Sequence, residues 1–269
     1  MLRSPLKLAG FTGFALAAAT TLSSAAGPAP DTPASVPVKT SRGEFQLLLS
    51  PPAPPAPSRP GGGQMVLLIS GEGGWRHIDV LLAGDLAAAG CWVGGIDVTK
   101  YFWEPQDDRQ ALAADMRAFA AALARAAGRK EGSDLVLAGF SFGADLAPWV
   151  AGAKGQEGWL RGLIMIAPDE TGSLQFRVLE ILGLQPKEHI FSVADALASA
   201  GGIPAALIHG QKDDGSAAPT LAATAREPKK IFLVDGADHH FSGKEAQLKT
   251  ALLDALNWIA SLGPKQPHE

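Results

Sequence analysis

The sequence predicts an α/β fold in which a mostly parallel central sheet has helices on both faces. Short apolar segments and longer amphipathic segments alternate along residues 64–262. The short segments are apolar throughout, as expected for strands buried on both faces of a sheet. A strand that follows a helix joins its parallel neighbour through a right-handed crossover, so we expect a single sheet.

The apolar segments give six expected strands. They are Met65–Ser70, Trp92–Val98, Asp134–Phe140, Leu163–Ala167, Ala205–His209 and Lys230–Val234. Helical spacing of apolar residues and alanine-rich composition give five expected helices. They are His77–Ala89, Asp107–Ala127, Ala144–Gly152, Ala217–Ala225 and Lys244–Leu262. The segment 172–203 has no clear pattern, and we interpret it as either a short lid or part of the core.

The N-terminus has the pattern of an export signal. Arg3 and Lys7 precede an uncharged apolar run, Leu8–Leu22, and small residues follow this run. The run is short for a membrane-spanning helix, so a retained anchor is the less favoured alternative. We therefore expect a signal peptide at residues 1–26, with cleavage after Ala26.

A flexible lead-in is expected at residues 27–63, before the α/β domain. Its first part is rich in Pro, Ala and Ser, and Glu44–Leu49 is the one strand expected in it. Pro51–Gly63 is a Pro- and Gly-rich loop that cannot hold a helix or strand. The α/β domain is then expected at residues 64–262, and a short tail at 263–269.

The composition indicates a globular protein with a sizeable core. Of 269 residues, 46% are hydrophobic and 19% are charged, which suits one large domain. The formal net charge of −4 gives no sign of the basic face that nucleic-acid binders need, so no nucleic-acid partner is expected. Cys91 is the only cysteine, so it cannot form an internal disulfide, and we expect a buried thiol.

A G-x-S-x-G motif lies between the third expected strand and the helix after it. The motif is Gly139–Gly143 (GFSFG), with Ser141 at its centre. In this context the serine occupies a tight turn that exposes its hydroxyl, and the flanking glycines allow the strand and helix to approach closely. Ser141 is therefore the predicted nucleophile of a serine hydrolase.

A serine nucleophile needs a base, and the chain order Ser, then acid, then His predicts where to find it. Asp213 and Asp214 follow the strand Ala205–His209, and His239 and His240 follow the last strand. We predict Asp213 as the acid and His239 as the base. Asp214 and His240 remain the alternatives.

The glycine-rich turn Ser70–Trp75 (SGEGGW) follows the first strand of the domain. Glycines let the backbone approach a substrate carbonyl, so the N–H groups of Glu72 and Gly73, with that of Phe142, are the predicted oxyanion hole. The alternative is a phosphate-binding loop. The turn lacks the Lys-Ser/Thr ending of a P-loop and the spacing of a dinucleotide site.

Further predicted substrate-binding residues lie near other strand ends. Tyr101, Phe102 and Trp103 follow Asp97 and would line an acyl pocket or, alternatively, cover an edge of the core. Asp145 lies one helical turn after Ser141, where it would face solvent or bind a cationic group. No spacing of histidines and carboxylates completes a metal site, so no metal or cofactor is expected.

Four segments in combination carry a family resemblance: Ser70–Trp75, Gly95–Trp103, Gly139–Asp145 and His239–Phe241. Together they resemble the VirJ/AcvB family of exported, virulence-associated bacterial α/β-hydrolases. The resemblance covers about residues 65–260. There are two departures, because the family usually has Asp at the position of Glu72 and a Glu-rich sequence at the position of Asp213-Asp214.

The resemblance implies a periplasmic hydrolase of the α/β-hydrolase fold. One branch of the family looks like hydrolases of aminoacylated phosphatidylglycerol, and other members are tied to type IV secretion as partners of exported proteins. The favoured function is cleavage of the ester in lysyl-phosphatidylglycerol, with Glu72, Asp97 and Asp145 attracting the ammonium. The alternatives are a general carboxylesterase or thioesterase, and a non-catalytic partner of a secretion system.

Overall fold

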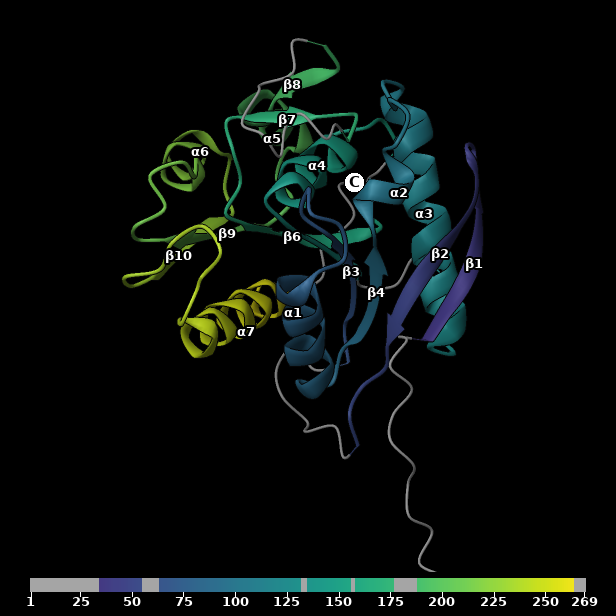
Figure 1. Cartoon of the computed structure of the whole chain (residues 1–269), viewed down its shortest axis with the longest axis horizontal. Coiled ribbons are helices and arrows are strands. Elements are labelled where there is room, and N and C mark those ends of the chain that lie inside the picture. The colour runs from purple at the N-terminus through teal and green to yellow at the C-terminus, as the bar shows by residue number, and fades with distance from the viewer. Residues whose placement is uncertain (1–33, 55–62, 132–134, 156–157, 177–187, 264–269) are drawn as a thin grey trace, which may run out of the picture. The chain divides into compact units, whose positions relative to one another are not determined.

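The computed structural model describes residues 34–263, except 55–62, 132–134, 156–157 and 177–187 (Figure 1). The predicted signal peptide and nearly all of the predicted tail lie outside the described residues. The strands of the main sheet are β1 (Ala34–Thr40), β2 (Gly43–Ser50), β3 (Met65–Ile69), β4 (Trp92–Ile96), β5 (Leu135–Phe140), β6 (Leu160–Ile166), β9 (Ala205–Gly210) and β10 (Lys229–Val234). The larger helices are α1 (His77–Ala88), α3 (Arg109–Ala126), α4 (Phe142–Ala151), α5 (Val193–Ala200), α6 (Ala218–Thr224) and α7 (Glu245–Ser261).

The eight strands form one sheet in the order β1-β2-β4-β3-β5-β6-β9-β10. All neighbours from β4 to β10 are parallel, and β2 is antiparallel to both β1 and β4. Helices α1 and α7 pack on one face, and α3, α4 and α6 pack on the other (Figure 1). The predicted α/β class and mostly parallel sheet are confirmed. The carboxyl ends of the parallel strands consequently meet at one edge of the sheet.

Strand β3 shows why the central strands are apolar at every position. Met65, Leu67 and Ile69 belong to the core cluster under α3 and α4, whereas Val66 and Leu68 belong to the cluster under α1 and α7. Successive side chains of a strand point to opposite faces, so a sheet covered on both sides needs apolar residues throughout.

The hairpin β1–β2 corrects the prediction of a mobile lead-in with only one strand. Residues 34–42 form a second strand and a turn, while the expected strand Glu44–Leu49 lies within β2. Pro37 is tolerated because β1 is an edge strand of the sheet. The hairpin turn is held on α3, since the amide and hydroxyl of Ser41 each donate a 2.7 Å hydrogen bond to Asp115. The composition of residues 27–42, rich in Pro, Ala and Ser, gave no indication that β1 extends the sheet.

The segment 172–203 contains a small ribbon and a helix. Strands β7 (Thr171–Ser173) and β8 (Ile190–Ser192) pair with each other, and α5 packs against α4. Phe176 and Phe191 are buried, so this part of the segment belongs to the core. Residues 177–187, the rest of the expected lid region, lie outside the described residues. Among the residues described, no helix is both long and apolar enough to cross a membrane.

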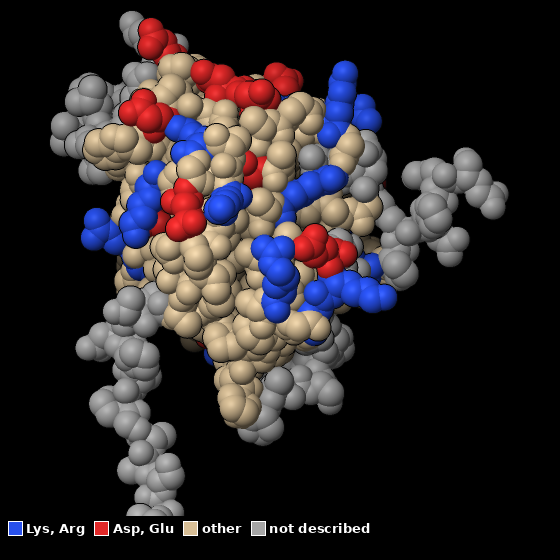
Figure 2. Space-filling view, turned by 90° about the vertical axis from the view of Figure 1, so that its right-hand side faces the viewer, with Lys and Arg blue, Asp and Glu red and all other residues tan. Residues whose placement is uncertain are grey.

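The surface of the β1 and α3 side has an uneven distribution of charge. Figure 2 shows acidic side chains along the upper edge of this face and Lys and Arg side chains below them. Glu104, Asp107 and Asp108 are exposed in the loop that precedes α3, at the end of the sheet where the parallel strands terminate. Negative charge at this edge favours the approach of cationic molecules.

Candidate active site

Ser141 occupies a strained turn between β5 and α4. Its backbone has φ 49° and ψ −117°, a conformation that non-glycine residues rarely adopt. The turn is held in place because the Ser141 amide donates a 2.9 Å hydrogen bond to Ile166 at the end of β6. Strain of this kind is found at functional sites, where the surrounding structure enforces it.

Gly139 and Gly143 are required by the packing around this turn. A Cβ atom on Gly139 would overlap the backbone of Gly143, and a Cβ atom on Gly143 would overlap the carbonyl oxygen of Ile69 in β3. The helix therefore starts directly against two strands. The N–H groups of its first residues, Phe142 among them, have no partner within the helix and lie beside Ser141.

The predicted nucleophile, base and acid are brought together. Nε2 of His239 lies 3.2 Å from Oγ of Ser141, and Nδ1 of His239 lies 2.9 Å from Oδ2 of Asp213. Ser141 and Asp213 are buried, and the side chain of His239 is 28% exposed. By contrast, Asp214 and His240 are exposed. The hydrogen-bonded series therefore contains Asp213 and His239, and the alternatives Asp214 and His240 lie outside it.

Hydrogen bonds and close packing hold the loop that carries Asp213 against the loop that carries His239. The amide of Lys212 donates to the carbonyl of Ala237 over 2.8 Å, and the amide of Gly236 donates to Oε1 of Gln211 over 2.9 Å. Gly210 has no side chain that would block this approach, since a Cβ atom there would lie 2.7 Å from the Asp238 carbonyl. The buried Phe241 fixes the other end of the histidine loop in the core. These contacts set the distance between Asp213 and His239.

The glycine-rich turn lies directly beside Ser141. Gly74 has φ 74° and donates a 3.0 Å hydrogen bond to Gly71, which closes the turn. The side chain of Glu72 points at the nucleophile, because Oγ of Ser141 donates a 3.0 Å hydrogen bond to Oε2 of Glu72. The sequence predicted a role for the backbone of Glu72 as an oxyanion donor, and this contact of its carboxylate is an additional feature.

Asp169 is a site residue that the sequence analysis missed. It follows β6, and its electrostatic neighbours are His239, Glu72 and Asp213. Burial raises its pKa, the neighbouring His239 lowers it, and the carboxylates of Glu72 and Asp213 raise it further. The available signal was its position just past the carboxyl end of a parallel strand.

Asp145 is buried and does not face solvent, so that expectation is wrong. Its Oδ1 accepts a 2.8 Å hydrogen bond from the amide of Asp169. Burial raises the pKa of Asp145 well above its usual value, and the nearby charges of Asp169 and Glu72 raise it further. Asp145 thus holds the loop that carries Asp169, and direct contact between Asp145 and a substrate stays a prediction.

The remaining predicted substrate-binding residues lie at different depths. Tyr101 and Phe102 are buried in the core, which was the alternative for them, and the phenol of Tyr101 donates a 2.5 Å hydrogen bond to Asp115. Phe102 lies beneath the site, with its ring centroid 5.5 Å from that of Phe142. Trp103 is 62% exposed. Tyr101 is the last residue of the short helix α2 (Val98–Tyr101), and Phe102 and Trp103 follow it.

Asp97 caps α2 rather than pointing freely into solvent. Its carboxylate accepts hydrogen bonds from the amide of Thr99 over 3.1 Å and from the hydroxyl of Thr99 over 2.7 Å. A Cβ atom on Gly74 would lie 2.9 Å from this carboxylate, so Asp97 packs against the glycine-rich turn. Its predicted contact with substrate remains untested, and the structure gives it a supporting position.

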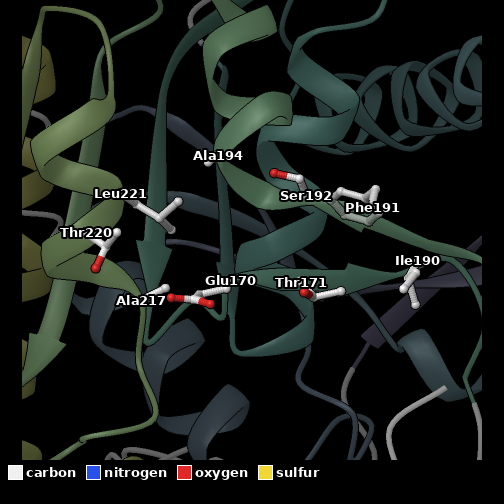
Figure 3. Close-up of a pocket in the computed structure, with 9 residues that line it drawn as sticks. All are labelled: Glu170, Thr171, Ile190, Phe191, Ser192, Ala194, Ala217, Thr220 and Leu221. Atoms are coloured by element: carbon white, nitrogen blue, oxygen red, sulfur yellow. The ribbon is translucent and has the colours of Figure 1, made fainter. Parts of the chain in front are cut away.

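One cavity lies beside the glycine-rich turn, and another lies beside the ribbon β7–β8. One, of about 470 Å³, is lined by the glycine-rich turn with Glu72, by the start of α1 with Arg76, and by Phe140 and His240. The other, of about 460 Å³, lies between β7, β8, α5 and α6, and Figure 3 shows Glu170 and Leu221 among its lining residues. The first cavity contains Glu72, which contacts Ser141, and it is also lined by Arg76, Asp79 and His240.

A comparison with protein families identifies the chain. The model of the family described as bacterial virulence protein (VirJ) matches residues 63–259. The chain belongs to the VirJ family. The predicted family is thereby confirmed over nearly the whole of the predicted α/β domain. No curated protein sequence matches this VirJ family member significantly.

Solved structures that are similar to this VirJ family member are α/β-hydrolases. An α/β serine hydrolase without a lid, XC6422 from Xanthomonas campestris, is 21% identical with a TM-score of 0.57, covering 88% of this chain and 98% of its own. The α/β-hydrolase GrgF from a Penicillium species is 15% identical with a TM-score of 0.61, covering 85% and 99%. Est1E from Butyrivibrio proteoclasticus is 14% identical with a TM-score of 0.57, covering 82% and 96%. The α/β-hydrolase fold is thus shown.

Proposed function

We propose that this protein is a serine ester hydrolase that acts through an acyl-enzyme at Ser141. The observation that carries the proposal is the hydrogen-bonded series Asp213, His239, Ser141 at a strained strand–helix turn. A protein that used the fold only to bind partners would have no need for these three groups at bonding distance. The alternative of a non-catalytic secretion partner is therefore less favoured.

The geometry supports the following steps. Oγ of Ser141 attacks the ester carbonyl while Nε2 of His239 takes the hydroxyl proton. Asp213 accepts the Nδ1–H of His239, which fixes the tautomer and stabilises the imidazolium. The tetrahedral intermediate then breaks its bond to the alcohol, which leaves with the proton from His239. Water, activated by the same histidine, cleaves the acyl-enzyme and restores Ser141.

The negative charge of the intermediate needs nearby donors. The amide of Phe142, the residue directly after Ser141, is the first donor at the start of α4, and the helix end adds a favourable dipole. The amides of Glu72 and Gly73 in the glycine-rich turn are the partners proposed to complete the oxyanion hole. The loss of one such donor typically costs about 10²–10³-fold in turnover.

The favoured substrate is aminoacylated phosphatidylglycerol, with lysyl-phosphatidylglycerol first. Such a lipid carries an ammonium beside its ester and a phosphodiester a few bonds away. The cavity beside the glycine-rich turn is lined by two acidic side chains, Glu72 and Asp79. Two basic side chains, Arg76 and His240, also line it, so the cavity offers partners for both charges. Export through the signal predicted at residues 1–26 would bring the enzyme to the lipid headgroups that face the periplasm. A general carboxylesterase remains the alternative.

The proposal is tested by lipid analysis. Purified protein is incubated with lysyl-, alanyl- and unmodified phosphatidylglycerol in mixed micelles, with Ser141→Ala as the control. We expect release of free lysine and alanine, conversion of both lipids to phosphatidylglycerol, and no reaction with Ser141→Ala. Intact aminoacyl lipids after incubation with an enzyme that cleaves simple esters would contradict the lipid assignment and favour the general esterase.

A further inference from the structure

The hydroxyl of Ser141 faces two acceptors. Oε2 of Glu72 lies 3.0 Å from Oγ, and Nε2 of His239 lies 3.2 Å away. A hydroxyl has a single proton, so Ser141 donates to one of the two groups at a time. The glutamate therefore competes with the base for this proton.

This competition opposes catalysis in two ways. General-base attack requires that Ser141 donate its proton to His239 and not to Glu72. In addition, an ionised carboxylate beside Ser141 repels the negative charge that develops on the substrate carbonyl oxygen. A cation that pairs with Glu72 lowers both costs, because it offsets the negative charge and competes for the carboxylate oxygens. A substrate that carries its own cation next to the scissile ester would therefore complete the site.

We propose that Glu72 is a specificity-determining residue that binds the α-ammonium of an aminoacyl ester and thereby frees Ser141 for His239. This proposal rests on the proposed ester hydrolase function. It goes further by assigning recognition to the α-ammonium and not to the side chain of the amino acid. The enzyme would accept several aminoacyl groups, provided that the α-amine is free.

Covalent geometry favours the α-ammonium. At attack the carbonyl carbon lies ~3 Å from Oγ of Ser141, and the α-nitrogen is two bonds of ~1.5 Å from that carbon. The α-nitrogen consequently lies about 3–4 Å from Oγ, which is the region that Glu72 occupies. The ε-nitrogen of a lysyl group is five bonds beyond the α-carbon and has no fixed position relative to Glu72.

The surroundings of Glu72 add negative charge to the same place. Asp169 is half-buried and interacts electrostatically with Glu72, and its loop is held by the hydrogen bond of its amide to Asp145. In the described part of the chain, the basic groups recorded close to these carboxylates are His239, which the reaction needs, and Arg76 and His240, which line the cavity. An arriving ammonium would therefore find a site with excess negative charge.

The test uses four p-nitrophenyl esters in two matched pairs. Alanyl and propionyl esters differ only by the α-ammonium, and 6-aminohexanoyl and hexanoyl esters differ only by a distant ammonium. The assay runs at about pH 7, where most α-amines still carry a proton. For the wild-type protein we expect kcat/KM to be at least tenfold higher for alanyl than for propionyl, with no such preference within the second pair.

The decisive variant is Glu72→Gln, which removes the charge and keeps the size of the side chain. We expect kcat/KM for the alanyl ester to fall roughly 10- to 100-fold relative to that for the propionyl ester, so that the preference of the wild-type protein is lost. Glu44→Gln is the matched control, because Glu44 is exposed on the hairpin β1–β2 and lines neither cavity, and it should keep the alanyl preference. Thermal unfolding measurements on both variants would check that each one is folded.

The outcomes separate the two proposals. Equal losses on the alanyl and propionyl esters would overturn the recognition role, since they would mean that Glu72 only shapes the turn. A wild-type preference for 6-aminohexanoyl over hexanoyl would also overturn it, because a general negative field would then attract any cation. In both cases the ester hydrolase stands. Absence of hydrolysis of all four esters would instead overturn the proposed function and this inference with it.

Discussion

Two neighbouring aspartates show how much the structure adds at the level of single residues. Asp213 is buried and lies 2.9 Å from His239, whereas Asp214 is exposed. The turn around Asp213 is tight. The amide of Asp213 donates a hydrogen bond to the carbonyl of Gly210, and the carbonyl of Asp213 accepts one from the amide of Ser216. Sequence position alone left both aspartates open, because both follow the same strand by a few residues.

This difference predicts opposite outcomes for two equivalent substitutions. Asp213→Asn should lower kcat for a p-nitrophenyl ester by about 10⁴-fold, because the amide would leave His239 in the wrong tautomer. Asp214→Asn removes the same charge one residue away and should change kcat less than threefold. Steady-state kinetics of the two purified variants measure both. The reverse pattern would show that the loop rearranges and that Asp214 is the acid.

At the level of secondary-structure elements, the site depends on how closely α4 begins against β3. The first turn of α4 lies so near that any side chain on Gly143 would overlap the Ile69 carbonyl. Gly84, in the middle of α1, has no atom within 4 Å of the position that a Cβ would occupy. The two glycines are therefore present for different reasons.

Alanine at these two positions should act in opposite directions. Gly143→Ala must push α4 away from β3, which displaces Ser141 and the Phe142 amide, so we expect at least a 100-fold loss of kcat/KM and a lower midpoint of thermal unfolding. Gly84→Ala should raise the free energy of unfolding by roughly 0.5–1 kcal/mol, because alanine favours the helix. Kinetics and chemical denaturation measure both effects. A fully active Gly143→Ala variant would contradict the described contact.

Most of the elements that sequence patterns predicted well are buried, although the edge strand β10 is partly exposed. Each of the six expected strands and five expected helices of the α/β domain appears with shifts of a few residues at its ends. Strand β1, helices α2 and α5, and the pair β7–β8 were missed. They are short or lie at an edge of the sheet, where burial is one-sided and leaves no continuous apolar run.

At the level of the whole molecule, the sequence could predict which loops meet but not which side chains touch. Parallel strands bring their carboxyl ends to one edge, so Ser141, Asp213 and His239 were expected at the same place. The contact between Glu72 and Ser141 depends on the turn Gly71–Gly74, and Asp169 belongs to no motif. Such contacts between separate loops have no periodic signal in the sequence.

The central claim is that Ser141 is an activated nucleophile, and active-site labelling tests it most directly. The folded protein is treated with a fluorophosphonate probe, and the modified residue is identified by mass spectrometry of its peptides. Fluorophosphonates react with serines that an adjacent base activates, so we predict one covalent adduct, at Ser141, and none in Ser141→Ala or after heat unfolding. Wild-type protein that stays unlabelled, or is labelled equally in the Ser141→Ala variant, would contradict the account.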